Sequence, residues 1–140
     1  MKKRIILAVL VLIFLWSVFL VSLFLDNPSR VGPKTIYVDA GNVGDPAEDG
    51  SSEHPFDMIQ EGVDKASPGY SVHVAAETYY ENVVIDESSI SLVGEKNTIL
   101  DGDGNGTIIY VIGQNVRVDG FTIQNGYQGI WLAGSNNTLS

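Results

Sequence analysis

The feature that most constrains the fold is an internal repeat near the C-terminal end of the sequence. Segment 109–115 is Ile-Tyr-Val-Ile-Gly-Gln-Asn, and segment 130–136, which lies 21 residues later, is Ile-Trp-Leu-Ala-Gly-Ser-Asn. An apolar strand, a glycine and a polar turn that recur about every 20 residues are typical of a solenoid. Each unit is too small to bury its own apolar face, so it must stack on the next unit. The repeat therefore predicts a stack of coils rather than an antiparallel sandwich.

Short segments of strand-forming residues, separated by Asn, Gly and Asp, fill much of the chain. We expect strands at residues 35–38, 71–75, 83–85, 90–93, 98–100, 108–112, 116–118, 121–123 and 129–132. Three short strands per coil of about 21–26 residues describe a parallel β-helix, whose coils stack at ~4.8 Å. On this register Asn115 lies beneath Asn136, and we predict a ladder of hydrogen bonds between their amides.

One amphipathic helix is expected outside the N-terminal segment, over about residues 55–67. Its apolar stripe consists of Phe56, Ile59, Val63 and Ala66. Asp57 would lie in or just before the first turn, and Pro68-Gly69 would end the helix. A helix placed just before a stack of strands can cover the open end of the core, so we expect it to act as a cap.

The N-terminal segment is a candidate membrane helix. Met1-Lys2-Lys3-Arg4 precedes residues 5–25, which carry no charge. A helix of that length, at ~1.5 Å per residue, reaches about 30 Å and matches a bilayer core. The basic cluster would hold the N-terminus in the cytoplasm. We expect residues 1–25 to be an uncleaved signal anchor, with a cleaved signal peptide as the alternative. Residues 26–34 would form a tether, and residues 35–140 an extracytoplasmic β-helix.

The extracytoplasmic part is strongly acidic and the chain has no cysteine. Four of the eight basic residues and one of the 17 acidic residues precede Val31, which leaves 4 against 16 and a net charge of −12. A surface of that sign repels nucleic acid and anionic lipid headgroups, so no nucleic-acid partner is expected. The absence of cysteine excludes disulfides and thiolate metal sites.

A longer pattern in residues 35–140 resembles a known superfamily. The pattern consists of Gly50-Ser51-Ser52-Glu53-His54-Pro55-Phe56 and the segments 57–66, 68–74, 78–85, 90–94 and 99–102. It is similar to the N-terminal part of secreted right-handed parallel β-helix proteins of the pectate-lyase-like superfamily, in a subgroup often grouped with NosD-like and DUF1565-type proteins. The resemblance implies the fold. Its members include polysaccharide lyases, glycan-binding surface proteins and copper-site accessory proteins.

The sequence departs from that superfamily at individual positions and at its end. Met58, Tyr70 and Glu77 stand where the pattern usually has Thr, Asp and Gly. The residues 136–140 lie part-way through a coil, and an uncapped coil would expose its strand edges and apolar cross-section. We therefore expect the chain to be part of a longer solenoid. The alternative is a complete chain that closes its open end by self-association.

The stretch 101–106 is a candidate calcium loop. Asp101, Asp103 and Asn105 match the first half of a calcium-binding pattern, but Ile112 occupies the position of the closing acid of an EF-hand. A looser site made of these three oxygen donors is one hypothesis. The favoured alternative is a tight turn in which Asp and Asn bond their own backbone. Apart from this possible calcium, no cofactor is expected.

Evidence for catalysis is sparse. A lyase in this superfamily would use an Arg or Lys base beside calcium, and the weak candidates are Arg117 and Asp119. A surface ion pair is the favoured interpretation of these two residues. His54, His73 and Met58 are too few and too dispersed to predict a copper cluster, and Met58 is expected to pack.

The aromatic residues indicate binding rather than chemistry. Tyr110 and Trp131 occupy equivalent positions of adjacent coils and are predicted to stack on each other. If they face outward, they form a platform of the kind on which sugar rings stack. We therefore expect a membrane-tethered, extracytoplasmic β-helix module that binds glycan or protein without catalysis. The alternative is the N-terminal fragment of a polysaccharide lyase, or another carbohydrate-active enzyme, with its site on further coils.

Overall fold

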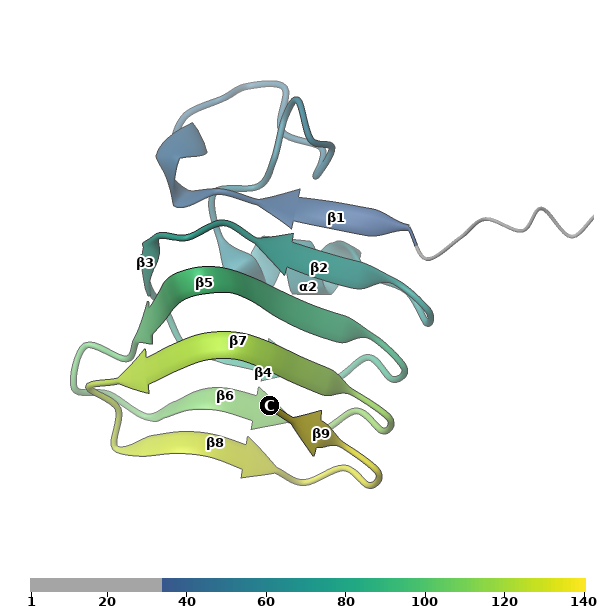
Figure 1. Ribbon diagram of the computed structural model, residues 1–140, viewed down its shortest axis with the longest axis vertical. Helices are drawn as coiled ribbons and strands as arrows, with labels where there is room; N and C mark the ends of the chain where they lie inside the picture. Colours follow the sequence, from purple (N-terminus) through teal and green to yellow (C-terminus); the bar gives the residue numbers. More distant parts are fainter. Residues whose placement is uncertain (1–33) are drawn as a thin grey trace, which may run out of the picture. The chain divides into compact units, whose positions relative to one another are not determined.

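The computed structural model describes residues 34–140, which form a parallel β-solenoid of about three turns with one short α-helix (Figure 1). The predicted anchor at 1–25 and nearly all of the predicted tether lie outside the described residues. Within residues 34–140, no helix has the length and hydropathy needed to cross a membrane.

The elements follow one another in short steps. The first part contains β1 (Thr35–Val38), the 3-10 turn η1 (Ala40–Asn42) and α2 (Ile59–Lys65). The strands that follow are β2 (Ser71–Val74), β3 (Thr78–Tyr80), β4 (Val83–Ile85), β5 (Ser91–Asp101), β6 (Thr107–Val111), β7 (Arg117–Gln124), β8 (Gln128–Leu132) and β9 (Thr138–Leu139).

All strand pairs are parallel, and each coil has three sides. The first side is formed by β1, β2, the beginning of β5, the beginning of β7 and β9, in that order. The second side is formed by β3 and the last parts of β5 and β7. The third side is the sheet β4-β6-β8, in which Ile109 pairs with Ile130 and Tyr110 with Trp131. The register inferred from the 21-residue repeat is thus confirmed.

Inward side chains form apolar ladders that run along the solenoid. On the first side, the ladder consists of Ile36, Val72, Leu92, Val118 and Leu139, each paired with the next. The four members before the last coil are 0–3% exposed. On the third side, Ile85, Val111 and Leu132 form a second ladder. Because like side chains lie directly above one another, each coil buries the apolar face of its neighbour.

One corner of the coil lies within an unbroken strand in two successive coils. The strands predicted at 90–93 and 98–100 are one strand, β5, and those at 116–118 and 121–123 are β7. The β5–β7 register shifts between Val93 and Thr98, where Gly94 lies against Gly120. Gly120 has φ +84°, and a Cβ there would overlap the carbonyl oxygen of Gly94. Glycine at these two positions therefore lets both strands bend while their backbones stay in contact. The strands β3 and β9 were not predicted from the sequence.

The helix α2 is shorter than predicted and begins at Ile59 instead of residue 55. The residues before it are extended because Phe56 forms a parallel bridge with Val38, and its N–H donates to the carbonyl of Tyr37. Asp57 therefore lies before the helix. Gly62 lets α2 approach the sheet closely, since a Cβ there would lie 2.7 Å from Cγ2 of Val38.

Two side chains fix α2 at the end of the stack. The N-cap residue Met58 makes no side-chain cap, and instead the carboxylate of Glu81 accepts from the N–H groups of Ile59 (2.7 Å) and Gln60 (3.0 Å). The amide of Gln60 donates to the carbonyl of Val84 (3.0 Å) and accepts from its N–H (2.8 Å). It therefore replaces a neighbouring strand at the edge of β4. The predicted role of the helix as a cap over the open end of the core stays a prediction.

The predicted amide ladder between Asn115 and Asn136 is wrong. Both residues have positive φ (55° and 59°) in equivalent turns, but no hydrogen bond joins their side chains in residues 34–140. The link between coils is made one residue later, by Asn137. Its Oδ1 accepts from the N–H of Val116 (2.8 Å), and its Nδ2 donates to the carbonyl of Gly113 (3.0 Å).

We predict that Gly120→Ala destabilises the fold far more than Gly44→Ala. Both glycines have φ near +80°, and Gly44 has no atom within 4 Å of a built Cβ. The control, Gly44→Ala, should lower the free energy of unfolding by about 1 kcal/mol, because alanine is strained in the left-handed backbone conformation. Gly120→Ala should lose roughly 3 kcal/mol, because the neighbouring coil must also shift. Urea unfolding followed by circular dichroism measures both, and equal losses would contradict the close contact of the corners.

Candidate functional site

The outer face of β4-β6-β8 carries an aligned row of apolar and aromatic side chains, which we call the outer ladder: Val84, Tyr110 and Trp131. Consecutive members are paired across the sheet. The rings of Tyr110 and Trp131 have centroids 5.8 Å apart and an interplanar angle of 58°. Trp131 is 54% exposed. The predicted contact between the two rings is therefore confirmed, although their planes are tilted instead of stacked, and both side chains lie on the outer face of the sheet.

A polar pair lies beside the outer ladder on the same two strands. Thr107 Oγ1 donates to Gln128 Oε1 over 3.0 Å, and both residues precede the aromatic pair by three positions. None of these four side chains is charged. An exposed aromatic surface next to hydroxyl and amide groups can contact the apolar face of a sugar ring and exchange hydrogen bonds with its hydroxyls.

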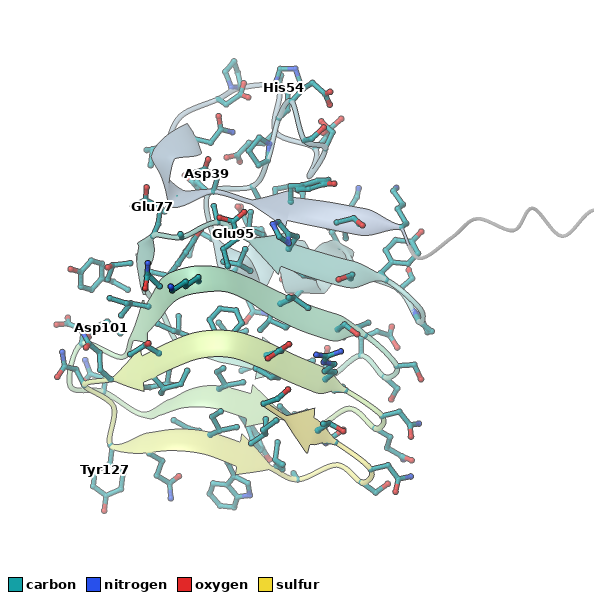
Figure 2. All side chains as sticks on the ribbon, in the orientation of Figure 1. Asp39, His54, Glu77, Glu95, Asp101 and Tyr127 are labelled. Carbon is teal, nitrogen blue, oxygen red and sulfur yellow. The ribbon has the colours of Figure 1, made fainter. Side chains whose placement is uncertain are left out.

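The predicted calcium ligands lie at the corner after β5 (Figure 2). Asp101 is buried, and its carboxylate accepts from the N–H of Asp103 (2.9 Å) and from the amides of Gln124 (2.9 Å) and Asn125 (2.7 Å). These donors, the Asp103 N–H first, lower the pKa of Asp101. Asn105 donates its own amide to the carbonyl of Asp103 (3.1 Å). These contacts are the ones expected of a tight turn in which Asp and Asn bond to the nearby backbone, which was the favoured alternative. A calcium site here stays a prediction.

The weak catalytic candidates form a surface ion pair, as favoured from the sequence. Arg117 Nη2 lies 2.6 Å from Asp119 Oδ2, and the two side chains are 55% and 29% exposed. Asp101 pairs with Gln124 at the other end of β7, so it does not join them. The structure brings together these two residues but no third group to complete a lyase site among the described residues.

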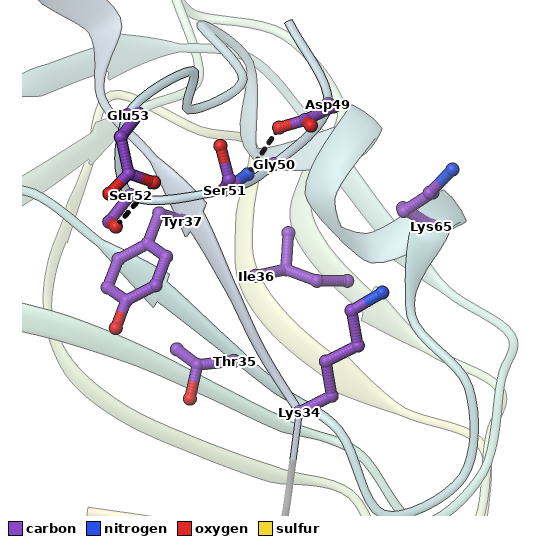
Figure 3. Close-up of a pocket in the computed structure, with 10 residues that line it drawn as sticks. All are labelled: Lys34, Thr35, Ile36, Tyr37, Asp49, Gly50, Ser51, Ser52, Glu53 and Lys65. Carbon is purple, nitrogen blue, oxygen red and sulfur yellow. Dashed lines mark hydrogen bonds between the residues drawn. The ribbon is translucent and has the colours of Figure 1, made fainter.

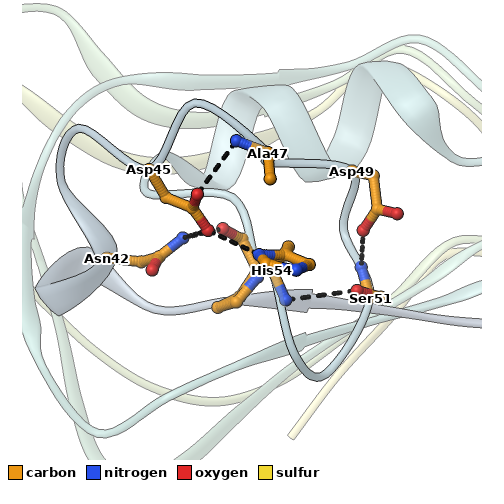
Figure 4. A network of polar contacts seen from close by, with 7 residues as sticks. Asn42, Asp45, Ala47, Asp49, Ser51 and His54 are labelled. Atoms are coloured by element: carbon orange, nitrogen blue, oxygen red, sulfur yellow. Dashed lines mark hydrogen bonds and ion pairs between the residues drawn. The ribbon is translucent and has the colours of Figure 1, made fainter.

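The histidines are each held by a different carboxylate. His54 Nδ1 lies 2.8 Å from Asp45 Oδ2 in the loop before α2 (Figure 4), and His73 Nε2 lies 2.9 Å from Glu95 Oε1. The hydrogen bond to Asp45 raises the pKa of His54, and the same bond lowers the pKa of Asp45. Met58 is 46% exposed, so the expectation that it packs is wrong. Its backbone instead forms the N-cap of α2.

Three carboxylates that the sequence analysis did not group converge near the start of α2. The side-chain oxygens of Glu48, Asp57 and Glu61 lie within 4.8 Å of one another. Glu48 Oε1 is buried and has no hydrogen-bond partner among the described residues. Such a group can share a hard divalent cation. Asp57 and Glu61 are four residues apart, a spacing that the sequence shows directly. Glu48 could not be grouped with them from the sequence, because its position depends on the fold of the loop between η1 and α2.

A shallow hollow of about 290 Å³ lies beside β1 (Figure 3). Lys34 and Lys65 both line it, together with Asp49, whose carboxylate accepts from the N–H of Ser51 over 2.8 Å. A second hollow of about 240 Å³ is lined by residues that include Tyr80 and Asp103. Neither hollow contains a set of groups arranged for catalysis.

Comparison with family models, with curated proteins and with solved structures finds no match to this chain. The strand pairing alone places the described residues in a structural class, the parallel β-solenoids. Its superfamily stays a prediction from the sequence.

We predict that the protein is more stable at pH 5.5 than at pH 7.5. Desolvation, together with Asp57 and Glu61, raises the pKa of Glu48, and burial raises the pKa of Glu81. The ordinary pKa of a glutamate is 4.5. Above that pH these two glutamates hold more protons in the folded state than in the unfolded state, so the free energy of unfolding decreases as the pH rises. His54, raised from 6.5, acts in the same direction near neutrality. Urea midpoints measured across this range test the sign.

Glu48→Gln isolates the contribution of the carboxylate cluster. We expect the variant to have a higher urea midpoint than wild type at pH 7.5, because the repulsion from Asp57 and Glu61 is removed. We also expect its midpoint to rise less than that of wild type when the pH is lowered from 7.5 to 5.5. Glu77→Gln is the matched control, since Glu77 is exposed and lies outside the cluster. If both variants showed the same pH dependence as wild type, the cluster would not be electrostatically coupled.

Proposed function

We propose that this chain is a non-catalytic, membrane-tethered binding module that presents its outer ladder to glycan outside the cytoplasm. The observation that carries the proposal is the outward pair of Tyr110, which is half-buried, and Trp131, which is exposed; their rings are in contact at paired positions of adjacent coils. Aromatic rings on an outer face leave apolar area in contact with water, which a ligand with an apolar face can cover.

The charge of the protein narrows the ligand class. The described residues contain 4 basic and 16 acidic side chains, so the molecule repels polyanions over most of its surface. The outer ladder and its Thr107–Gln128 pair are uncharged. We therefore propose a neutral polysaccharide as the ligand, held by ring stacking and by hydrogen bonds to its hydroxyls, rather than a uronate polymer.

The location and the superfamily are parts of the same proposal. The uncharged segment 5–25 after a basic cluster supports the anchor, and the parallel solenoid supports a right-handed β-helix of the pectate-lyase-like, NosD-like or DUF1565 type. The alternative, an N-terminal fragment of a lyase, would need its catalytic groups on further coils, because Arg117 is engaged by Asp119 among the described residues.

Affinity electrophoresis in gels that contain neutral or acidic polysaccharides tests the proposal. We expect at least one neutral polymer to retard the wild-type protein. For Trp131→Ala we expect a dissociation constant larger by on the order of tenfold, since one aromatic ring is lost. Tyr127→Ala is the control, because Tyr127 is 86% exposed and projects from the last coil outside the outer ladder (Figure 2).

Three results would contradict the proposal. They are no retardation on any polymer, equal retardation of wild type and Trp131→Ala, and retardation by polyanions alone. Formation of unsaturated products would favour the lyase alternative instead.

A further inference from the structure

We propose that the hollow beside β1 binds a zwitterionic phosphate, a small group in which a phosphate and an ammonium are joined by a short carbon linker, as in phosphocholine and phosphoethanolamine. We call this site the β1 hollow, and it is lined by Lys34, Thr35, Ile36, Tyr37, Lys65 and the segment 49–53. The β1 hollow shares no residue with the outer ladder, so the inference goes beyond the proposed function and does not depend on it.

The β1 hollow gathers half of the basic residues of the described chain. Residues 34–140 contain 4 basic side chains against 16 acidic ones, and two of the four, Lys34 and Lys65, line this one hollow although they are distant in the sequence. Neither lysine forms an ion pair within residues 34–140. Lys34 Nζ lies 5.7 Å from the centroid of the Tyr70 ring. Two ammonium groups without a carboxylate partner can each bind an oxygen of a phosphate.

The other side of the β1 hollow suits a cation. Figure 3 shows Tyr37, Ser52 and Glu53 on one side, and Lys34 and Lys65 on the other. Glu53 Oε2 accepts from the Ser52 hydroxyl over 2.9 Å, and Glu53 forms no ion pair among the described residues. A carboxylate beside an aromatic ring attracts an ammonium group by its charge and by a cation–π contact.

The balance of charges favours a zwitterion over a simple anion. Asp49 also lines the β1 hollow, although its carboxylate accepts from the N–H of Ser51 over 2.8 Å and so holds the loop. With Asp49 and Glu53 opposing Lys34 and Lys65, the lining carries equal numbers of acidic and basic side chains. A ligand with one sign of charge would be repelled on one side, whereas a zwitterion finds an opposite charge on each side.

The fold holds the walls of the β1 hollow in place. Strand β1 pairs with β2 along its length, and the N–H of Tyr37 donates to the carbonyl of Gly50 over 2.9 Å. Gly50 has φ +79°, and a Cβ there would lie 2.6 Å from Cε2 of Phe56, so glycine lets the loop lie close to the strand. Lys65 lies in the last turn of α2. A site assembled in advance from three segments loses little conformational freedom on binding.

The size of the β1 hollow limits the ligand to a small one. Its volume is about 290 Å³. In an α-amino acid a single carbon joins the two charged groups, which is too short to reach both sides. Phosphocholine and phosphoethanolamine place two carbons and an ester oxygen between phosphorus and nitrogen. Because the lysines and Glu53 are exposed, we expect a dissociation constant in the millimolar range.

Amide chemical shifts of the ¹⁵N-labelled full-length chain in nonionic detergent, recorded during titration with phosphocholine, test the site. We expect shift changes centred on β1 and on residues 50–53, because these segments line the β1 hollow. We also expect phosphocholine to bind more tightly than either inorganic phosphate or choline, since each of these satisfies only one side. Shift changes at Tyr110 and Trp131 would report on the outer ladder separately.

Conservative variants assign the two sides of the β1 hollow. Lys34→Gln and Lys65→Gln should each weaken phosphocholine binding about threefold, because each removes one exposed charge. Glu53→Gln should weaken the binding of phosphocholine but not that of inorganic phosphate. Lys96→Gln is the matched control, since Lys96 is an exposed lysine of β5 outside the hollow, and it should bind like wild type.

Nanodiscs of phosphatidylcholine or of phosphatidylglycerol separate two sources of the same chemistry. If a lipid headgroup occupies the β1 hollow, phosphatidylcholine nanodiscs alone should shift its amides and block added phosphocholine. If the natural ligand is a soluble or glycan-linked phosphocholine, added phosphocholine should shift these amides equally in both lipids. Either result supports the proposal.

Three results would overturn the proposal. They are no change at the β1 hollow well above the millimolar range, binding of inorganic phosphate or of choline as tight as that of phosphocholine, and unchanged affinity in both lysine variants. The comparison of the three ligands uses the wild-type chain alone, so it decides even if a variant fails to fold.

Discussion

The structure depends on the vertical stacking of inward aliphatic side chains from coil to coil. A single coil has three short strands and no second layer, so it can bury Val72 or Leu92 only against the equivalent residue of the next coil. The parallel ladder hydrogen bonds fix the spacing, and the apolar contacts select the register, because a shift by one residue would turn each side chain outward. Stability is therefore a property of neighbouring coils, and each end of the stack needs its own solution.

The described residues meet that requirement at the first end of the stack. At the first end, α2 and the preceding loop supply hydrogen-bond partners that imitate a further coil, most directly through the Gln60 amide on Val84. This leaves the acidic groups around Glu48 crowded, which has a cost in stability at neutral pH. At the last coil, the ladders end in exposed Leu132 and Leu139. The outer ladder runs along the side of the stack from Val84 to Trp131, on a face that the stacking requirement does not use.

The sequence was most informative where local pattern and stacking act together. The 21-residue repeat predicted the pairing of Tyr110 with Trp131. It was least informative where long-range contacts override local preference. Phe56 was placed in the helix by its periodicity, but its bridge to Val38 keeps it extended. Glu81 and Glu48 reach their positions from distant loops, so no local pattern identified the helix cap or the carboxylate cluster.

The most direct test of the stacked register is the pattern of interstrand nuclear Overhauser effects in the full-length chain. The account predicts cross-peaks between the backbone protons of Leu92 and Val118, of Val118 and Leu139, and of Tyr110 and Trp131, all in the parallel pattern. Cross-peaks that instead joined consecutive strands in an antiparallel pattern, such as β6 with β7, would contradict the solenoid and every inference drawn from it.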